Sequence, residues 1–475
     1  IDAGTASDAD HDRIDEIVRD LGVLRPAPES EDGRLSVPLV VERKDGGARV
    51  AIDGHAQELA VGGWSNWYTL DFELSALVRV RALTRARLVS LEPLELFVDT
   101  LQIDPAHAPF WQPVSQPPAF AAELAHGLGA GFETVGWACL TMPFKDARID
   151  ARTFVEDIEF TQGWRTKLLD LALARDDWRV LVNVESTPDR VQHMLYQYYD
   201  PAHPKYDAAK AAQTVPYFGR ETKLADVIPE TYRQMDATIG RVLDQHVRPG
   251  DTLIVCSDHG FQSFRRQVHL NNWLCQEGYL ALRADTTTAS KDLSFVDWTR
   301  TRAYALGLGG IYLNLKGREA AGIVEPAERD ALMAEITTKL LALEDQGVRV
   351  VHDVARLDAI HSGPHLDLEP DLMPGFAAGW RVSWTTTGGG MALEPGPGVD
   401  DPARPRPCFA DNTSNWSGDH VSVASALVPG VFFCNRKVEI PAGGVDLLHI
   451  APTVLALTGV PIPASYQKPA LRLLP

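Results

Sequence analysis

The hydrophobic and polar positions follow two different periods in two parts of the chain. Between residues 34 and 104, apolar and polar side chains alternate in short runs, as in residues 48–52 before the Asp53-Gly54 turn. This alternation predicts an all-β module. From residue 105 onward, helical runs alternate with short apolar runs, which is typical of an α/β fold with a mostly parallel sheet flanked by helices. The predicted helices are residues 120–128, 151–174, 189–199, 228–246, 326–344 and 446–457, and the predicted strands are residues 178–184, 252–256, 310–315, 348–354 and 430–434.

These periods divide the chain into three parts. Residues 1–33 form an N-terminal segment with a short amphipathic helix predicted at residues 12–21, residues 34–104 form a β-rich insert module, and residues 105–475 form an α/β domain. The Gly- and Pro-rich stretch 385–407 is predicted to be a long surface loop. The aromatic residues of the module either pack a small β core, which we favour, or present a surface for a carbohydrate or aromatic ligand. They are Trp64, Trp67, Tyr68 and Phe72.

Composition and charge exclude several classes of protein. Of the 475 residues, 45% are hydrophobic and 23% are charged, which is typical of a globular protein and not of a disordered or collagen-like one. The 64 acidic and 45 basic side chains give a net charge of −19, so we expect no binding of duplex nucleic acid, whose phosphates the chain would repel. No apolar run approaches the ~18 residues of a membrane span, so we expect none. The five cysteines form no C-x-x-C pair, which argues against a cysteine zinc site.

Candidate chemistry follows two of the predicted strands. Asp258 and His259 come directly after a buried strand, and ligands of open α/β sheets gather beyond the carboxyl ends of strands. These two residues either bind a cation or simply close a turn. Asp189 and His193 follow another predicted strand at an i,i+4 spacing. That spacing puts a carboxylate and an imidazole on one helix face, where both can ligate one metal ion.

A third candidate donor is His420, which follows Gly418 and Asp419 in a polar loop. One carboxylate and one imidazole leave a metal ion short of ligands, so His420 would supply the next donor of a shared site. Each of these motifs alone also fits ordinary surface residues. Nitrogen and oxygen donors without thiolate suit Zn²⁺ and are compatible with Mn²⁺ or Fe, so the residue types leave the metal open.

A series of segments, taken in order along the chain, resembles the type I phosphodiesterase/nucleotide pyrophosphatase family of the alkaline phosphatase superfamily. The segments are PDRVQHM at 188–194, YDPAHP at 199–204, CSDHGF at 256–261, LNNWL at 270–274, GGIYLNLKGRE at 309–319, GDH at 418–420 and APTVLAL at 451–457. The resemblance implies an alkaline-phosphatase-like α/β fold. It also implies a metal-dependent hydrolase of phosphoric esters, above all phosphodiesters, with a small-molecule phosphate ester as substrate.

The resemblance further implies a site with two divalent metal ions, Zn²⁺ before Mn²⁺ or Fe. One ion would be held by Asp189, His193 and His420. The second would be held by Asp258 and His259, together with an Asp and a Thr or Ser nucleophile that the family carries near its N-terminus. Two such ions clamp the phosphoryl oxygens and stabilise the leaving oxygen of an in-line displacement.

The family's opening strand and its nucleophile-bearing turn have no counterpart that we identify in this chain. Thr141 ends a segment, WACLT, that is superficially similar to a nucleophile segment, but it follows the β module and not a first strand. We therefore expect the nucleophile upstream of residue 1, in an upstream segment or a companion chain of the same gene product. The alternative is a non-catalytic protein that keeps the fold as a binding or scaffold subunit. The compartment stays open, and the resemblance favours the periplasm or the cell exterior.

Two further groups allow two interpretations each. His361, His365, Asp367 and Asp371 form a His- and Asp-rich run, which indicates either another metal site or, as we favour, a solvated loop. The tyrosines near His193 either line a substrate cleft or pack the helix onto the core, and we favour packing. They are Tyr196, Tyr198 and Tyr199.

Overall fold

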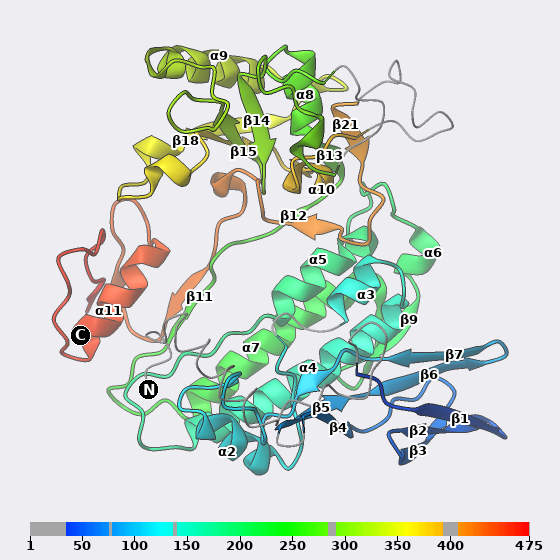
Figure 1. Ribbon diagram of the computed structural model, residues 1–475. Coiled ribbons are helices and arrows are strands. Elements are labelled where there is room, and N and C mark those ends of the chain that lie inside the picture. Colours follow the sequence, from blue (N-terminus) through cyan, green and yellow to red (C-terminus); the bar gives the residue numbers. More distant parts are fainter. Residues whose placement is uncertain (1–34, 76–77, 136–139, 284–290, 393–406, 475) are drawn as a thin grey trace, which may run out of the picture. The chain divides into compact units, whose positions relative to one another are not determined.

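The computed structural model describes residues 35–75, 78–135, 140–283, 291–392 and 407–474 (Figure 1). The chain divides into two compact units. The first comprises Ile1–Pro143 with Thr153–Asn183, and the second comprises Phe144–Arg152 with Val184–Pro475. Most of residues 105–183, which we predicted within the α/β domain, therefore groups with the β-rich module. The helix predicted at residues 12–21 and most of the loop predicted at 385–407 lie outside the described residues.

The first unit contains the predicted β-rich module, whose paired strands are antiparallel. Along the second strand, Ala48, Val50 and Ile52 are buried, as the period of two predicts. Asp53 and Gly54 have φ values of 49° and 79°, which is the backbone of a two-residue hairpin turn with positive φ at both positions. The strands are β1 (Leu39–Lys44), β2 (Gly47–Ile52), β3 (His55–Ala60), β4 (Tyr68–Ser75), β5 (Val78–Thr84), β6 (Ala86–Leu91), β7 (Leu94–Val98) and β8 (Gln102–Ile103).

The aromatic residues of the module pack inward. Tyr68 belongs to the β core and Phe72 packs against it. Trp64 and Trp67 lie against the buried guanidinium of Arg85, whose Cζ is 4.7 Å and 5.2 Å from their ring centroids. The rings therefore make their contacts with other residues of the unit, as the β-core interpretation predicts.

The same unit contains helix α2 (Ala119–Leu128) and all but the first two residues of helix α4 (Ala151–Leu173). Helix α2 ends at Gly129, whose φ of 68° is the left-handed conformation of a glycine C-cap. Ala121 and Ala125 of α2 pack against Trp164 of α4. The helices that the 3.6-residue period predicts at 120–128 and 151–174 are therefore present, each within a residue of its predicted bounds.

The second unit holds an extensive apolar core, which surrounds a four-stranded sheet in the order β14-β15-β19-β18. Helix α8 contacts β14, and α9 contacts β18 and β19 (Figure 1).

The helices are α5 (Thr187–Tyr199), α6 (Ala208–Ala211), α7 (Val227–Gln245), α8 (Leu270–Gln276), α9 (Arg329–Leu341), α10 (Trp384–Thr387) and α11 (Ile450–Leu457), and α3 (Thr141–Lys145) crosses the unit boundary. The strands are β9 (Thr214–Tyr217), β10 (Arg220–Lys223), β11 (Ile254–Cys256), β12 (Gln262–Ser263), β13 (Arg266–Val268), β14 (Ala303–Leu306), β15 (Gly310–Leu313), β16 (Glu344–Asp345), β17 (Val348–Arg349), β18 (Val351–Arg356), β19 (Leu372–Phe376), β20 (Trp380–Val382), β21 (Phe409–Asp411), β22 (Gly418–Asp419), β23 (Phe432–Cys434), β24 (Val438–Glu439) and β25 (Arg472–Leu473).

The sheets differ from the mostly parallel sheet that we predicted. The described strands form small sheets that are nearly all antiparallel, and β13 with β20 is the parallel pair among them. Residues 178–184, where we predicted a strand, are not part of a strand in the structure, and Val180 and Val182 are 46% and 82% exposed. A continuous apolar run is typical of a strand buried on both faces. The run does not specify which strand would cover it.

Within the described part of the chain, no helix combines the length and the apolar character that a membrane crossing requires.

Candidate metal centre

Helix α5 carries the first pair of predicted donors. Pro188 lies in its first turn, where a fixed φ favours helix initiation, and Asp189 lies there too, where the helix dipole favours a carboxylate. The i,i+4 spacing places Asp189 Oδ2 3.4 Å from His193 Nε2. The His193 side chain is 2% exposed and that of Asp189 is 25% exposed. The imidazole is therefore buried while the carboxylate stays partly accessible.

Strand β22 brings in the third donor. It pairs antiparallel with β12, and His420 follows it directly. His420 Nε2 lies 3.7 Å from Asp189 Oδ2. One ligand atom from each of Asp189, His193 and His420 lies within 4.8 Å of the others. The fold thus brings together three residues that the sequence places on two distant segments.

Gly418 allows the close approach of β22 to α5. A Cβ at this position would lie far closer than 3.0 Å to the Gln192 carbonyl oxygen and to the ring of Tyr196. Without that Cβ, the Gly418 carbonyl oxygen reaches His193 Nδ1 at 2.8 Å. Glycine is therefore required here by the helix–strand contact and not by an unusual φ.

Backbone carbonyl contacts fix which ring nitrogen donates in two of the imidazoles. His193 Nδ1 lies 2.8 Å from the Gly418 oxygen, and His259 Nδ1 lies 3.0 Å from the Gly260 oxygen. Because a carbonyl oxygen can only accept a hydrogen bond, each Nδ1 is the donor, which leaves Nε2 as the ring nitrogen that can face a metal ion. This arrangement, in which the outer ring nitrogen donates to a backbone carbonyl, is the one that metal-ligating histidines adopt.

The second predicted pair, Asp258 and His259, follows β11 and lies beside the three donors. The imidazole of His259 stacks on that of His420, with ring centroids 3.4 Å apart and an interplanar angle of 10°. Asp258 Oδ2 lies 3.3 Å from His259 Nε2, and the Asp258 side chain is 74% exposed. The structure therefore places His259 against the cluster and leaves the Asp258 carboxylate largely in solvent.

The rings around the cluster create an apolar wall. The His193 ring centroid is 4.0 Å from that of Trp416 and 4.7 Å from that of Phe261. Burial, together with the neighbouring His259 and His193, lowers the pKa of His420 to about 4. At neutral pH the His420 imidazole is uncharged, which is the form that binds a metal ion.

Three residues that contact the site were missed by sequence reasoning. The Asp419 carboxylate accepts hydrogen bonds from Arg381 Nε at 2.6 Å and from Trp416 Nε1 at 2.7 Å. Burial lowers the pKa of Arg381, and the Asp419 carboxylate opposes that effect. Asp419 could have been noticed because it lies inside the GDH segment. Arg381 and Trp416 carry no local pattern, because their role depends on a contact between distant segments.

The donor set fits a divalent cation. Two imidazoles and a carboxylate, without thiolate, are ligands for Zn²⁺, Mn²⁺ or Fe. The Gly418 carbonyl accepts a hydrogen bond from His193 Nδ1, and metal-ligating histidines are commonly oriented by such a bond. The residues present therefore suit the metal that the sequence predicted at Asp189, His193 and His420.

A second group of acidic residues lies in the first unit but already contains a cation. Ligand atoms of Asp99, Glu133 and Asp157 lie within 4.8 Å of one another, and all three residues are buried. Arg85 Nη2 lies 3.3 Å from Asp99 Oδ2 and 2.7 Å from Asp157 Oδ1. Burial, with the nearby Asp157 charge, raises the pKa of Asp99 to about 6. The guanidinium thus supplies a positive charge to two of the three carboxylates.

The His- and Asp-rich run 361–371 does not form a metal cluster among the described residues. His361 Nδ1 lies 2.9 Å from Glu369 Oε2 on the surface. Asp371 is fully buried and bonded to Arg318 and Arg329, at 2.8 Å and 2.9 Å. The run therefore combines a surface ion pair with a structural buried carboxylate.

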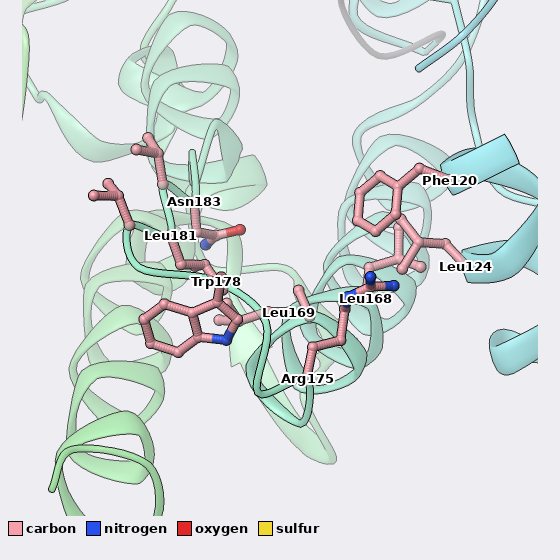
Figure 2. Close-up of a pocket in the computed structure, with 11 residues that line it drawn as sticks. Phe120, Leu124, Leu168, Leu169, Arg175, Trp178, Leu181 and Asn183 are labelled. Atoms are coloured by element: carbon pink, nitrogen blue, oxygen red, sulfur yellow. The ribbon is translucent and has the colours of Figure 1, made fainter. Parts of the chain in front are cut away.

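A pocket in the first unit is lined mainly by apolar side chains. It has a volume of about 360 Å³, and Figure 2 shows side chains of α2, of α4 and of the segment 178–183 around it. Arg175 at this pocket is already bonded to Glu123 and Asp177, at 2.8 Å and 2.6 Å. The lining includes none of the predicted metal ligands, so we do not assign catalysis to it.

Comparison with known families matches residues 99–392 to the model of type I phosphodiesterase / nucleotide pyrophosphatase. The match defines the chain as a hydrolase of the phosphodiesterase and pyrophosphatase type. The chain belongs to the type I phosphodiesterase/nucleotide pyrophosphatase family, which has an α/β fold. A search of curated proteins found no match to this chain.

Proposed function

We propose that the protein is a metal-dependent phosphodiesterase whose site holds two divalent cations. Asp189, His193 and His420 would hold one cation, and Asp258 and His259 would contribute to the second. The observation that carries the proposal is the cluster of three donors within 4.8 Å of one another, formed from α5 and the residue after β22. Family membership supports a hydrolase acting on this class of bond.

A bound divalent cation supplies a Lewis acid that neutralises charge on the phosphoryl oxygens. The residues of the chain prepare the donors for it. Gly418 orients the His193 ring through its carbonyl, so that Nε2 faces the Asp189 carboxylate. The rings of Phe261 and Trp416 exclude water from the inner side of the cluster, which strengthens electrostatic interactions there.

The proposed nucleophile is a Thr or Ser that an upstream segment or a companion chain of the same gene product supplies. Thr141, the candidate within this chain, is fully buried at the start of α3, which supports a nucleophile from elsewhere. The proposed substrate is a small-molecule phosphate ester, and the proposed metal is Zn²⁺, with Mn²⁺ or Fe compatible with the same donors.

Hydrolysis of bis-p-nitrophenyl phosphate by the complete gene product, loaded with Zn²⁺ or Mn²⁺, tests this proposal. Asp189→Ala should reduce the rate at least ~100-fold, because it removes the carboxylate that would bind the metal ion together with the two imidazoles. Asp244→Ala, which removes an exposed carboxylate of α7, should leave the rate unchanged. The proposal is wrong if the loaded wild-type protein cleaves neither this diester nor p-nitrophenyl phosphate. Retention of metal without hydrolysis, seen by native mass spectrometry, would support the scaffold alternative.

A further inference from the structure

The carboxylate of Asp419 uses both of its oxygens to hold the turn that ends in His420. Oδ1 accepts from the backbone N–H groups of His420 and Val421, each at 2.8 Å. Oδ2 accepts from Arg381 Nε at 2.6 Å and from Trp416 Nε1 at 2.7 Å. Asp419 is 1% exposed, so these partners take the place of water around its carboxylate.

Arg381 is the cation that holds this carboxylate. Its side chain is 1% exposed, and its Nη1 donates to the Val382 carbonyl at 2.8 Å. Its Cζ lies 4.1 Å from the ring centroid of Trp384 and 5.4 Å from that of Phe264. A planar guanidinium packed between rings has little freedom to move, so it defines the position of the Asp419 oxygen that it contacts.

Strand β20 therefore holds the turn after β22 at two points. At one point, Arg381 pairs with Asp419. At the other, the N–H of the next residue, Val382, donates to Ser422 Oγ at 3.1 Å. Ser422 has a φ of 57°, a left-handed conformation that costs free energy in a non-glycine residue and persists only where surrounding contacts impose it. His420 lies between these two points.

We propose that Arg381 is a positioning residue for His420, acting through Asp419 to fix the turn that presents the imidazole to the Asp189 carboxylate. The inference rests on the proposed metal site at Asp189, His193 and His420. Arg381 touches none of the donor atoms in the described contacts. Its effect is to hold one ligand where the other two require it.

Zinc affinity of the full chain, measured by competition with a chromophoric chelator, tests the proposal. Arg381→Met should weaken Zn²⁺ binding about 10–100-fold, as the loss of outer-shell support does at metal sites. Arg381→Lys, which keeps the charge, should restore part of that loss. Arg318→Met is the matched control, because it removes an arginine from another buried aspartate, Asp371, in the same unit and should change affinity less than about 2-fold.

The double variant R381M/D419N keeps the test valid if Arg381→Met alone does not fold, because it removes both buried charges together. It should also bind Zn²⁺ about 10–100-fold more weakly than the wild type. If the Arg381 variants bind Zn²⁺ as tightly as Arg318→Met, the positioning role is overturned while the metal site stands. If the wild-type protein binds neither Zn²⁺ nor Mn²⁺, the metal site itself is wrong, and the positioning role falls with it.

Discussion

Replacing Gly418 by alanine tests the closest contact between the two segments that supply the metal donors. The added Cβ would overlap the Gln192 carbonyl oxygen and the Tyr196 ring. The tyrosine ring can rotate a little, but the Gln192 oxygen belongs to the backbone of α5 and moves only with the helix. The substitution must therefore separate β22 from α5.

The size of the effect follows from the geometry. To restore an ordinary contact of 3.4 Å, strand and helix must separate by about 1 Å. That movement stretches the 2.8 Å hydrogen bond between Gly418 and His193 past the ~3.2 Å limit of good N–H···O bonds. We expect overpacking to lower the free energy of unfolding by about 1–3 kcal/mol. The loss of support for His193 should weaken Zn²⁺ binding about 10–100-fold.

Two measurements on the same protein preparations check this prediction. Chemical denaturation gives the change in the free energy of unfolding, and competition with a chelator gives the zinc affinity. Gly443→Ala is the matched control, because nothing lies within 4 Å of a Cβ at that position, and both quantities should stay near the wild-type values. Unchanged stability and unchanged affinity in Gly418→Ala would refute the helix–strand contact as the structure has it.

Three further predictions concern stability. Burial raises the pKa of Asp99 from 3.8 to about 6, so the folded protein is most stable with this carboxyl protonated. That stability is fully present below pH 3.8 and is lost as the pH rises through 6. Between pH 3.5 and pH 7 the wild type should lose about 3 kcal/mol relative to Asp99→Asn, and parallel pH profiles of unfolding would contradict this. Asp371→Asn leaves Arg318 and Arg329 without their shared carboxylate, and denaturation should show a loss of about 3 kcal/mol with zinc affinity unchanged. Gly240→Ala, inside α7 with no neighbour within 4 Å of the new Cβ, should raise the unfolding free energy by about 0.5–1 kcal/mol, and a decrease would contradict that expectation.

Local features of the fold follow from the sequence alone. The alternation in residues 47–52 and the Asp53-Gly54 pair predict the first hairpin, because strand period and turn backbone depend on neighbouring residues only. The helix at 187–199 follows from its proline in the first turn and its apolar period. The same spacing predicts that Asp189 and His193 lie on one helix face, and they do.

The tertiary structure alone decides which segments meet. The apolar run at 178–184 has the sequence of a buried strand, yet the structure does not form a strand there. The approach of His420 to Asp189 depends on the small volume of Gly418 against α5. The Arg381–Asp419 pair depends on β20 lying beside the turn after β22. Contacts of this kind are set by the packing of distant surfaces, and a residue's neighbours in sequence carry no information about them.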